Sequence, residues 1–313
     1  MDLGLKGKVA VITGSTEGIG KATALKFAEE GAKVAICSRD AAKVKAAVDE
    51  IQKAGGEVFG MVADISKADD IEKFINGAVA KFGRLDILVN NAGSSQRGKF
   101  LETEDAKWAS DFELKVFGAI RCTRLAVPHM IKLGGGRVIN ITNVAAKQPG
   151  AESGPTSISR AAGLALTKML SKEFAAQNVL VNTVTIGKIK SGQHERTRKK
   201  LGLEPDVYFK KVASDIPMGR MGETAEAADA IVFLASSMAN YVTGTSINLD
   251  GGISGVLSGR RCALYDQRAV YGILCKRVFS LKRRHAIFEL NREAVQGSFP
   301  VMNGHGPFPA NVV

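Results

Sequence analysis

The sequence predicts one doubly wound α/β domain built on a single parallel sheet, followed by a basic C-terminal extension. Apolar runs at residues 9–12 and 33–38 are typical of strands that are buried on both faces, and amphipathic helices alternate with them. A glycine-rich turn joins the first run to the first helix. With 313 residues, of which 45% are hydrophobic, the chain can form one large α/β core without a second domain.

The first strand and the turn after it form the segment 9–20, VAVITGSTEGIG, which predicts a site for a nucleotide phosphate. Gly14 permits a tight turn, Gly18 lets the backbone approach a pyrophosphate, and Gly20 lets the helix pack on the strand. The helix is expected from Lys21 onward, and its N-terminus offers free N–H groups and a positive dipole end to an anion. Such a pattern alone also fits a structural turn, but its place between strand and helix favours the phosphate site.

The glycine spacing, T-G-x-x-x-G-x-G, resembles that of the short-chain dehydrogenase/reductases. Asp64, the Asn-Asn-Ala-Gly run at 90–93, and Gly244 with the Asp-Gly-Gly run at 250–252 fall where that family has them, so the likeness covers residues 5–257. It implies a Rossmann-fold domain over residues 1–257 that binds a nicotinamide cofactor and acts as an oxidoreductase on CH–OH or C=O groups. The residues that it assigns to the cofactor are Thr13, Gly14, Ser15, Thr16, Gly18, Ile19, Gly20, Ser38, Arg39, Asp64, Ile65, Asn91, Ala92, Gly93, Gly187, Ile189 and Ser191.

The end of the second strand, at 33–38, indicates which cofactor fits. In a doubly wound sheet this point faces the adenosine ribose, where an acidic residue would bind the ribose hydroxyls of NAD. Ser38 and Arg39 instead leave room and a guanidinium group for a 2′-phosphate, which favours NADP. Glu17 argues for NAD, because NADP-preferring members of the family commonly carry a basic residue there.

The following elements alternate as this fold requires. Helices are expected at residues 41–54, 71–82, 108–130, 161–176 and 225–236, and strands at 58–63, 85–89, 137–141, 180–184 and within 244–252. By resemblance Asp64 lies against the adenine, although it could instead cap the next helix, and Asn91 stabilises the central sheet. The helices at 108–130 and 161–176 pair across a subunit interface in the family, which implies a homodimer or a homotetramer.

The segment that should carry the chemistry departs from the family pattern at every position. The family uses an asparagine in the long helix, a serine after the next strand, and a Tyr-x-x-x-Lys pair on the helix that follows. Alignment on neighbouring residues places Lys115, Asn143, Thr156 and Arg160, in that order, at these four positions. An aliphatic hydroxyl is a much poorer proton donor than a phenol, and an arginine is effectively always protonated. The family's proton relay therefore cannot be transferred residue by residue.

Two cations in one cleft are the main feature that remains. Lys115 and Arg160 are expected beside the nicotinamide pocket, where each would depress the pKa of the other. Lys115 is the candidate proton donor or base, and Arg160 would hold the cofactor ribose or an anionic substrate group. The amide of Asn143 and the hydroxyl of Thr156 would orient a carbonyl. The competing interpretation is drift in a protein that no longer catalyses, with both cations in solvent or paired with Glu113 or Glu152.

Residues 192–215 are polar and rich in charge, and they lie where the family carries its mobile substrate lid. Just before them, Ile189 and Ser191 stand where the family holds the nicotinamide carboxamide, and an Ile-Gly turn at 186–187 replaces the usual Pro-Gly. His194 could act as a general base, although a lone histidine in a charged loop is more often a solvated bystander. The substrate is expected to be a small molecule, with an anionic one as an option.

Composition sets further limits. The net charge is +12, and residues 258–313, which exceed the family's usual length, hold nine Lys/Arg against three Asp/Glu. We interpret them as a poorly ordered tail whose middle could form a basic amphipathic helix for a membrane surface or a partner. No nucleic-acid motif or zinc-like cysteine spacing is present, so neither nucleic acid nor metal is expected. Without a long apolar run or a signal-peptide core, a cytoplasmic protein is expected.

Three functional hypotheses follow. The first is NADPH-dependent reduction of a carbonyl or imine by an atypical mechanism. The second is a nucleotide-binding pseudoenzyme that serves as a subunit partner or sensor. The third is a non-redox lyase or hydratase whose cationic cleft stabilises an enolate. The phosphate turn suits all three hypotheses, and only the cleft separates them.

Overall fold

Seven parallel strands form one sheet in a computed structural model that describes residues 2–255. The strand order is β3-β2-β1-β4-β5-β6-β7, so the chain reverses direction across the sheet between β1 and β4. The strands are β1 (Val9–Ile12), β2 (Lys33–Ser38), β3 (Val58–Val62), β4 (Ile87–Asn90), β5 (Gly136–Asn143), β6 (Val179–Ile186) and β7 (Ser246–Leu249). The predicted doubly wound α/β class is confirmed, and in this class ligands bind at the carboxyl ends of the strands near the reversal point.

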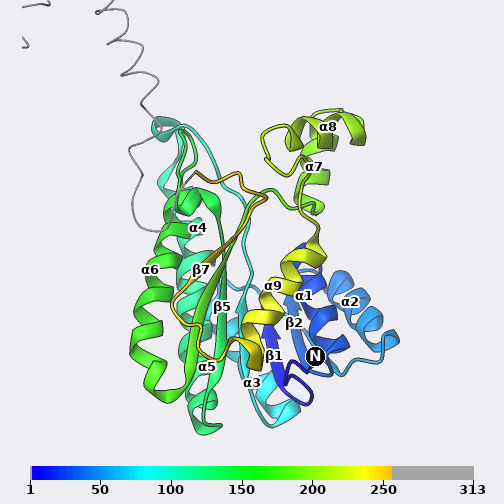
Figure 1. Cartoon of the computed structure of the whole chain (residues 1–313), viewed down its shortest axis with the longest axis vertical. Helices are drawn as coiled ribbons and strands as arrows, with labels where there is room; N and C mark the ends of the chain where they lie inside the picture. The colour runs from blue at the N-terminus through cyan, green and yellow to red at the C-terminus, as the bar shows by residue number, and fades with distance from the viewer. Residues whose placement is uncertain (1, 256–313) are drawn as a thin grey trace, which may run out of the picture. The chain divides into compact units, whose positions relative to one another are not determined.

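Helices cover both faces of the sheet (Figure 1). They are α1 (Gly18–Glu29), α2 (Ala41–Lys53), α3 (Ala68–Phe82), α4 (Asp105–Phe112), α5 (Gly118–Lys132), α6 (Thr156–Phe174), α7 (Gly192–Lys200), α8 (Pro205–Ala213) and α9 (Thr224–Ala235). One core packs α1, α2 and α9 on the sheet around Phe27, and the other packs α3, α5 and α6 around Phe74. Neighbouring residues of β1 enter opposite cores, Ile12 the first and Val11 the second, because side chains alternate along a strand.

The long helix expected at 108–130 is interrupted. A π-helical turn, Glu113–Phe117, separates α4 from α5 and contains Lys115. Such a turn inserts one extra residue into a helix and occurs frequently at functional sites. Other helices also begin earlier than expected, among them α1 at Gly18, α3 at Ala68 and α6 at Thr156. The residues aligned with the family's Tyr-x-x-x-Lys pair therefore lie on the first turns of α6.

A row of buried polar side chains fixes α6 against the sheet. Asn90 donates through Nδ2 to Oδ1 of Asn140 at 2.9 Å, and Asn140 donates to Oγ1 of Thr167 at 2.8 Å. The row ends at Thr183, whose hydroxyl lies 2.7 Å from that of Thr167. Because buried polar groups are costly unless they are paired, this row favours one position of α6 over the sheet. It thereby also sets the position of Thr156.

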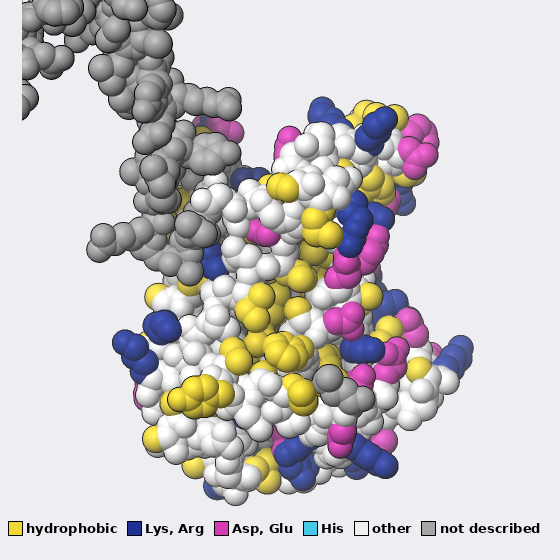
Figure 2. All heavy atoms as spheres, viewed as in Figure 1, with side chains coloured by type: hydrophobic (Ala, Val, Ile, Leu, Met, Phe, Trp, Pro, Cys, Tyr) yellow, Lys and Arg dark blue, Asp and Glu magenta, His cyan; other side chains and the backbone are white. Residues whose placement is uncertain are grey.

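The predicted lid, residues 192–215, contains the two short helices α7 and α8, which lie at the upper right of Figure 1. Lys and Arg side chains are prominent on this part of the surface (Figure 2), and α7 contributes Arg196, Arg198, Lys199 and Lys200. No helix within residues 2–255 is long and apolar enough to cross a membrane. The proposed tail, 258–313, lies outside the described residues together with Cys262 and Cys275.

Candidate active site

The turn between β1 and α1 has the geometry that a phosphate group requires. Gly14 and Gly18 have φ values of +62° and +56°, in the left-handed region that favours glycine. A Cβ atom on Gly20 would lie 2.4 Å from the carbonyl oxygen of Gly14, so this position excludes any side chain. Within residues 2–255, the N–H groups of Gly18, Ile19 and Gly20 donate to no acceptor. These free donors at a helix N-terminus fit a pyrophosphate.

Thr13 and Ser15, two of the expected cofactor residues, brace this turn and are not among the residues that line the large cleft. Oγ1 of Thr13 accepts the backbone N–H groups of Asn91 and Ala92, each at 3.0 Å. Ser15 is fully buried, and its hydroxyl donates to the carbonyl oxygen of Ile12 at 2.6 Å. Asn91 donates through Nδ2 to the carbonyl oxygens of Thr13 and of the glycine after it, at 2.9 and 2.8 Å. Asn91 thus has the expected structural contacts between β4 and the turn.

A cleft with a cavity volume of about 400 Å³ opens beside this turn. This volume lies within the roughly 300–1,000 Å³ of pockets that hold a small-molecule ligand or a cofactor. The other fifteen expected cofactor residues line it: Gly14, Thr16, Gly18, Ile19, Gly20, Ser38, Arg39, Asp64, Ile65, Asn91, Ala92, Gly93, Gly187, Ile189 and Ser191.

Asp64 and Glu17, at the adenosine end of the cleft, both differ from the simplest expectation. Asp64 does not cap α3, whose N-cap residue is Lys67; its Oδ1 accepts instead from the N–H and hydroxyl of Ser66. Glu17 is paired with two cations, 2.9 Å from Nζ of Lys43 and 3.7 Å from a guanidinium nitrogen of Arg196. The Glu17 carboxylate is therefore balanced by positive charge from α2 and from the lid.

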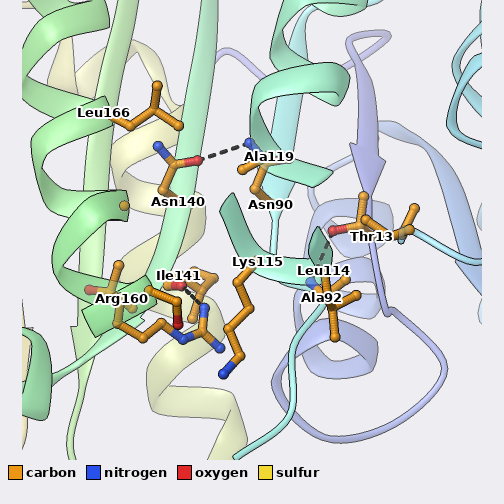
Figure 3. Close-up of a pocket in the computed structure, with 14 residues that line it drawn as sticks. Thr13, Asn90, Ala92, Leu114, Lys115, Ala119, Asn140, Ile141, Arg160 and Leu166 are labelled. Carbon is orange, nitrogen blue, oxygen red and sulfur yellow. Dashed lines mark hydrogen bonds between the residues drawn. The ribbon is translucent and has the colours of Figure 1, made fainter. Parts of the chain in front are cut away.

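Lys115, the candidate proton donor or base, is not among the residues that line the large cleft. Its side chain is only 1% exposed, and its ammonium group contacts the carboxylate of Asp111. The same group donates to Oγ1 of Thr156 at 2.9 Å. Figure 3 shows the ammonium group of Lys115 close to the guanidinium group of Arg160, which comes from α6. The two expected cations are thus brought together.

Burial lowers the pKa of Lys115 to about 8, and the positive charge of Arg160 contributes to this lowering. The carboxylate of Asp111 acts in the opposite direction through its hydrogen bond and its charge. The expected effect of a neighbouring cation on the lysine pKa is therefore present, but burial is the larger cause.

Asp111 and Ser159 are parts of this network that the sequence analysis missed. Asp111 is fully buried, and its second oxygen accepts the hydroxyl of Ser159 at 2.6 Å. The spacing of four residues between Asp111 and Lys115 was the available signal, since such a pair meets on one face of a helix. The network runs from Ser159 through Asp111 and Lys115 to Thr156.

Thr156 lines the cleft and connects it to the buried network. Its Oγ1 accepts two hydrogen bonds, from the backbone N–H of Gln96 at 2.7 Å and from Lys115. A hydroxyl has two acceptor sites and one hydrogen, so the hydrogen of Thr156 is left for a third partner.

Asn143 and Arg160 also line the cleft. Neither atom of the Asn143 amide makes a hydrogen bond within residues 2–255, and its Oδ1 is buried without a partner. Arg160 contacts the carbonyl oxygen of Ile141, and a Cβ atom on Gly93 would lie 2.4 Å from its Nη2. Within residues 2–255, neither Lys115 nor Arg160 forms the ion pair with Glu113 or Glu152 that drift would allow. Glu113 is paired with Arg121 instead.

His194 is not a solvated bystander. It lines the cleft on α7, and its Nδ1 lies 2.9 Å from the hydroxyl of Tyr208 on α8. Burial, aided by the charge of Lys188, holds the pKa of His194 below its usual value, so the ring is neutral at pH 7. Nε2 is left for another partner.

Comparison with known proteins agrees with this geometry. A family profile described as Enoyl-(Acyl carrier protein) reductase matches residues 14–254. An uncharacterized oxidoreductase of Thermotoga maritima is 38% identical over 254 residues, which cover 81% of this chain and 100% of that protein. The 3-oxoacyl-(acyl-carrier-protein) reductase FabG of the same organism is 34% identical over 249 residues, with coverages of 80% and 98%.

Among solved structures, L-sorbose reductase from Gluconobacter frateurii, complexed with NADPH and L-sorbose, has a similar fold. It has a TM-score of 0.80 at 33% identity and covers 82% of this chain and 100% of that one. From the matching profile, the relatives and the phosphate turn, we conclude that the chain belongs to the short-chain dehydrogenase/reductase family.

Proposed function

We propose that this protein is an NADPH-dependent reductase of a carbonyl group in a small molecule, with Thr156 as the proton donor and Lys115 as the proton reserve behind it. The reductases among its relatives, one of them complexed with NADPH, support the reaction. The single observation that carries the mechanism is the hydroxyl of Thr156, which accepts two hydrogen bonds and keeps its hydrogen for the cleft.

When bound, the reduced nicotinamide supplies the hydride. The carbonyl oxygen then gains negative charge, and Thr156 stabilises it by donating its hydroxyl proton. An isolated threonine would be a poor acid, but Lys115 can pass a proton to Oγ1 across 2.9 Å in the same step. A pKa of about 8 lets Lys115 give up that proton near neutral pH and recover it from solvent afterwards.

Asp111 and Arg160 support this relay without meeting the reacting proton. Asp111 holds Lys115 in place and keeps part of its charge, while Ser159 orients the carboxylate. Arg160 is fixed by the carbonyl oxygen of Ile141 and adds positive charge beneath the cleft, which favours the developing alkoxide. An anionic substrate group could meet Arg160 but not Arg196. Arg196 is paired with Glu17, whereas Arg160 contacts one carbonyl oxygen and its Nε is buried without a partner within residues 2–255.

NADP is favoured over NAD at the adenosine end. Ser38 and Arg39 line the cleft where a 2′-phosphate would lie, and no carboxylate stands in their place. The objection raised by Glu17 is weakened, because Lys43 and Arg196 balance its charge. These cations would add to the attraction for a phosphate group.

Neither alternative hypothesis gains comparable support. A pseudoenzyme would not need a buried lysine that donates to a hydroxyl on the cleft wall, and FabG and L-sorbose reductase, described above, are reductases. A lyase would use the cations directly, yet Lys115 does not line the cleft.

We also propose that the protein assembles as a homodimer or homotetramer through α5 and α6. These helices flank an apolar groove, and Ile131 and Met169 on its walls are 40% and 52% exposed. A contact between copies would remove both side chains from water. Sedimentation or light scattering of the full chain at several concentrations tests this assembly.

The function is tested by measuring the binding of NADPH and NADH by calorimetry, followed by a panel of carbonyl compounds read at the reduced-nicotinamide absorbance. We expect tighter binding of NADPH and oxidation of NADPH by at least one carbonyl. Failure of both cofactors to bind at millimolar concentration would overturn the proposal, and tight binding without any turnover would return the pseudoenzyme hypothesis.

A further inference from the structure

Asn143 differs from other asparagine residues of the sheet in one respect. Asn90, Asn140 and Asn182 each donate through Nδ2 to another part of the protein. The Oδ1 of Asn90 also has no partner within residues 2–255, but Asn90 does not line the cleft. Asn143, at the end of β5, uses neither its oxygen nor its nitrogen within residues 2–255. A buried amide oxygen without a partner is costly, so its retention on the wall of a ligand cleft indicates that a ligand pairs with it.

An amide differs from the serine hydroxyl that the family places at this position, because it carries its donor and its acceptor on two separate atoms, whereas a hydroxyl carries both on one. Nδ2 of Asn143 can donate to a carbonyl oxygen, and Oδ1 can at the same time accept a hydrogen bond. A carbonyl compound matches both atoms when it carries a hydroxyl on the adjacent carbon, since its two oxygens can then face the same side. An unsubstituted ketone would leave Oδ1 unpaired.

The part of the lid that lines the cleft offers further polar partners. Helix α7 has the sequence GQHERTRKK, without an apolar side chain, and it contributes Gln193 and His194 to the cleft wall. Nδ1 of His194 is engaged by Tyr208, which leaves the other ring nitrogen of a neutral imidazole for a hydroxyl group. A fatty acyl chain would find no apolar contact on this helix, whereas a polyhydroxylated molecule would find several hydrogen-bonding groups.

We infer that the substrates are α-hydroxycarbonyl compounds, such as small ketoses, and that Asn143 selects them by bridging the carbonyl oxygen and the neighbouring hydroxyl. This inference rests on the proposed carbonyl reduction. It makes Asn143 a specificity-determining residue as well as a carbonyl-orienting one, while Thr156 remains the proton donor.

The test compares hydroxyacetone with methoxyacetone in the full-length protein with NADPH. The methoxy compound keeps the electron-withdrawing oxygen but cannot donate a hydrogen bond, so intrinsic carbonyl reactivity is matched. For the wild-type protein we expect kcat/KM to be at least about tenfold higher for hydroxyacetone, the effect of losing one donor to a buried acceptor. In the variant Asn143→Ala the ratio should fall to within about threefold of unity, because both the donor and the acceptor of the amide are removed.

The outcomes separate the two proposals. Equal kcat/KM values for the two ketones in the wild-type protein, or a preference that Asn143→Ala leaves unchanged, would overturn the role of Asn143 and leave carbonyl reduction standing. If neither these ketones nor any other carbonyl oxidises NADPH, the proposed function fails and the inference fails with it. Asn143→Leu, which removes both polar atoms, should lower kcat/KM for hydroxyacetone more than for methoxyacetone.

Discussion

Raising the pH from 7 to 9 is expected to lower kcat/KM for carbonyl reduction about tenfold. Reduction consumes a proton, and in the proposed relay that proton leaves Lys115 through Thr156. Burial and the nearby Arg160 lower the pKa of Lys115 to about 8. Lys115 is therefore roughly nine-tenths protonated at pH 7 and roughly one-tenth protonated at pH 9. The reverse oxidation needs a neutral Lys115, so its kcat/KM should rise by the same factor over this range.

The assay is the initial rate of NADPH oxidation at saturating cofactor, in buffers of constant ionic strength between pH 6 and pH 10. Two variants assign the titrating group. Asp111→Asn removes the carboxylate that raises the pKa of Lys115, so the fall should move to lower pH. Lys115→Arg keeps a cation but titrates far above this range, so the fall between pH 7 and pH 9 should disappear.

A wild-type profile that stays flat from pH 7 to pH 9.5 would refute the reasoning. So would a fall that Lys115→Arg leaves in place, because another group would then control the rate. Circular dichroism of each variant across the pH range separates a kinetic effect from unfolding, which matters because removal of one partner of a buried ion pair typically costs about 3–5 kcal/mol.

Three further predictions concern the donor, the cofactor and the fold. Thr156→Val removes the donated proton and should lower kcat by about 10²–10⁴, while Thr156→Ser should stay within about tenfold of wild type; equal losses would exclude the hydroxyl as donor. Arg39→Asp should shift the ratio of the NADPH and NADH dissociation constants at least about tenfold toward NADH by calorimetry; an unchanged ratio would place the 2′-phosphate elsewhere. Burial raises the pKa of Asp86, but the hydrogen bond from Arg84 and the other partners outweigh burial and hold this pKa below its usual value. The ionised carboxylate therefore stabilises the fold above about pH 4, and this stabilisation is lost as the pH falls. Asp86→Asn should thus lower the free energy of unfolding by about 1–3 kcal/mol at pH 7, with a smaller difference at pH 3 in urea titrations.

The strands were largely predictable from the sequence, because strands buried on both faces must be apolar. β2 has the predicted limits, and β4 begins two residues later than expected and ends one residue later. Helix starts were less predictable. The last three residues of the glycine turn, 18–20, already belong to α1. Both α1 and α6 start without a hydrogen bond from a side-chain cap, so neither start carries the usual capping signal.

The two halves of the site were predictable to different degrees. Glycines at the phosphate turn are dictated by backbone geometry, so the pattern alone located this half of the cleft. The position of Lys115 depends on a π turn, which a helical period of 3.6 residues does not reveal. It also depends on burial against Asp111, for which the spacing of four residues was the available signal. The charge pattern indicated two cations in one place, but it did not indicate that one of them lies behind a hydroxyl.

The substitutions in the catalytic segment depend on one another, which argues against drift. A buried ammonium group is tolerated only with partners, and Lys115 has Asp111 and Thr156. Its ammonium group lies 2.9 Å from Oγ1 of Thr156. A tyrosine at position 156 would extend past this point, so its ring would need the space that the ammonium group occupies. Thr156→Tyr alone should therefore disrupt the pair and lower activity, whereas Thr156→Tyr combined with Lys115→Asn should be less harmful than the sum of the single changes. Additive effects in this double-mutant cycle would mean that the two positions changed independently, as drift requires.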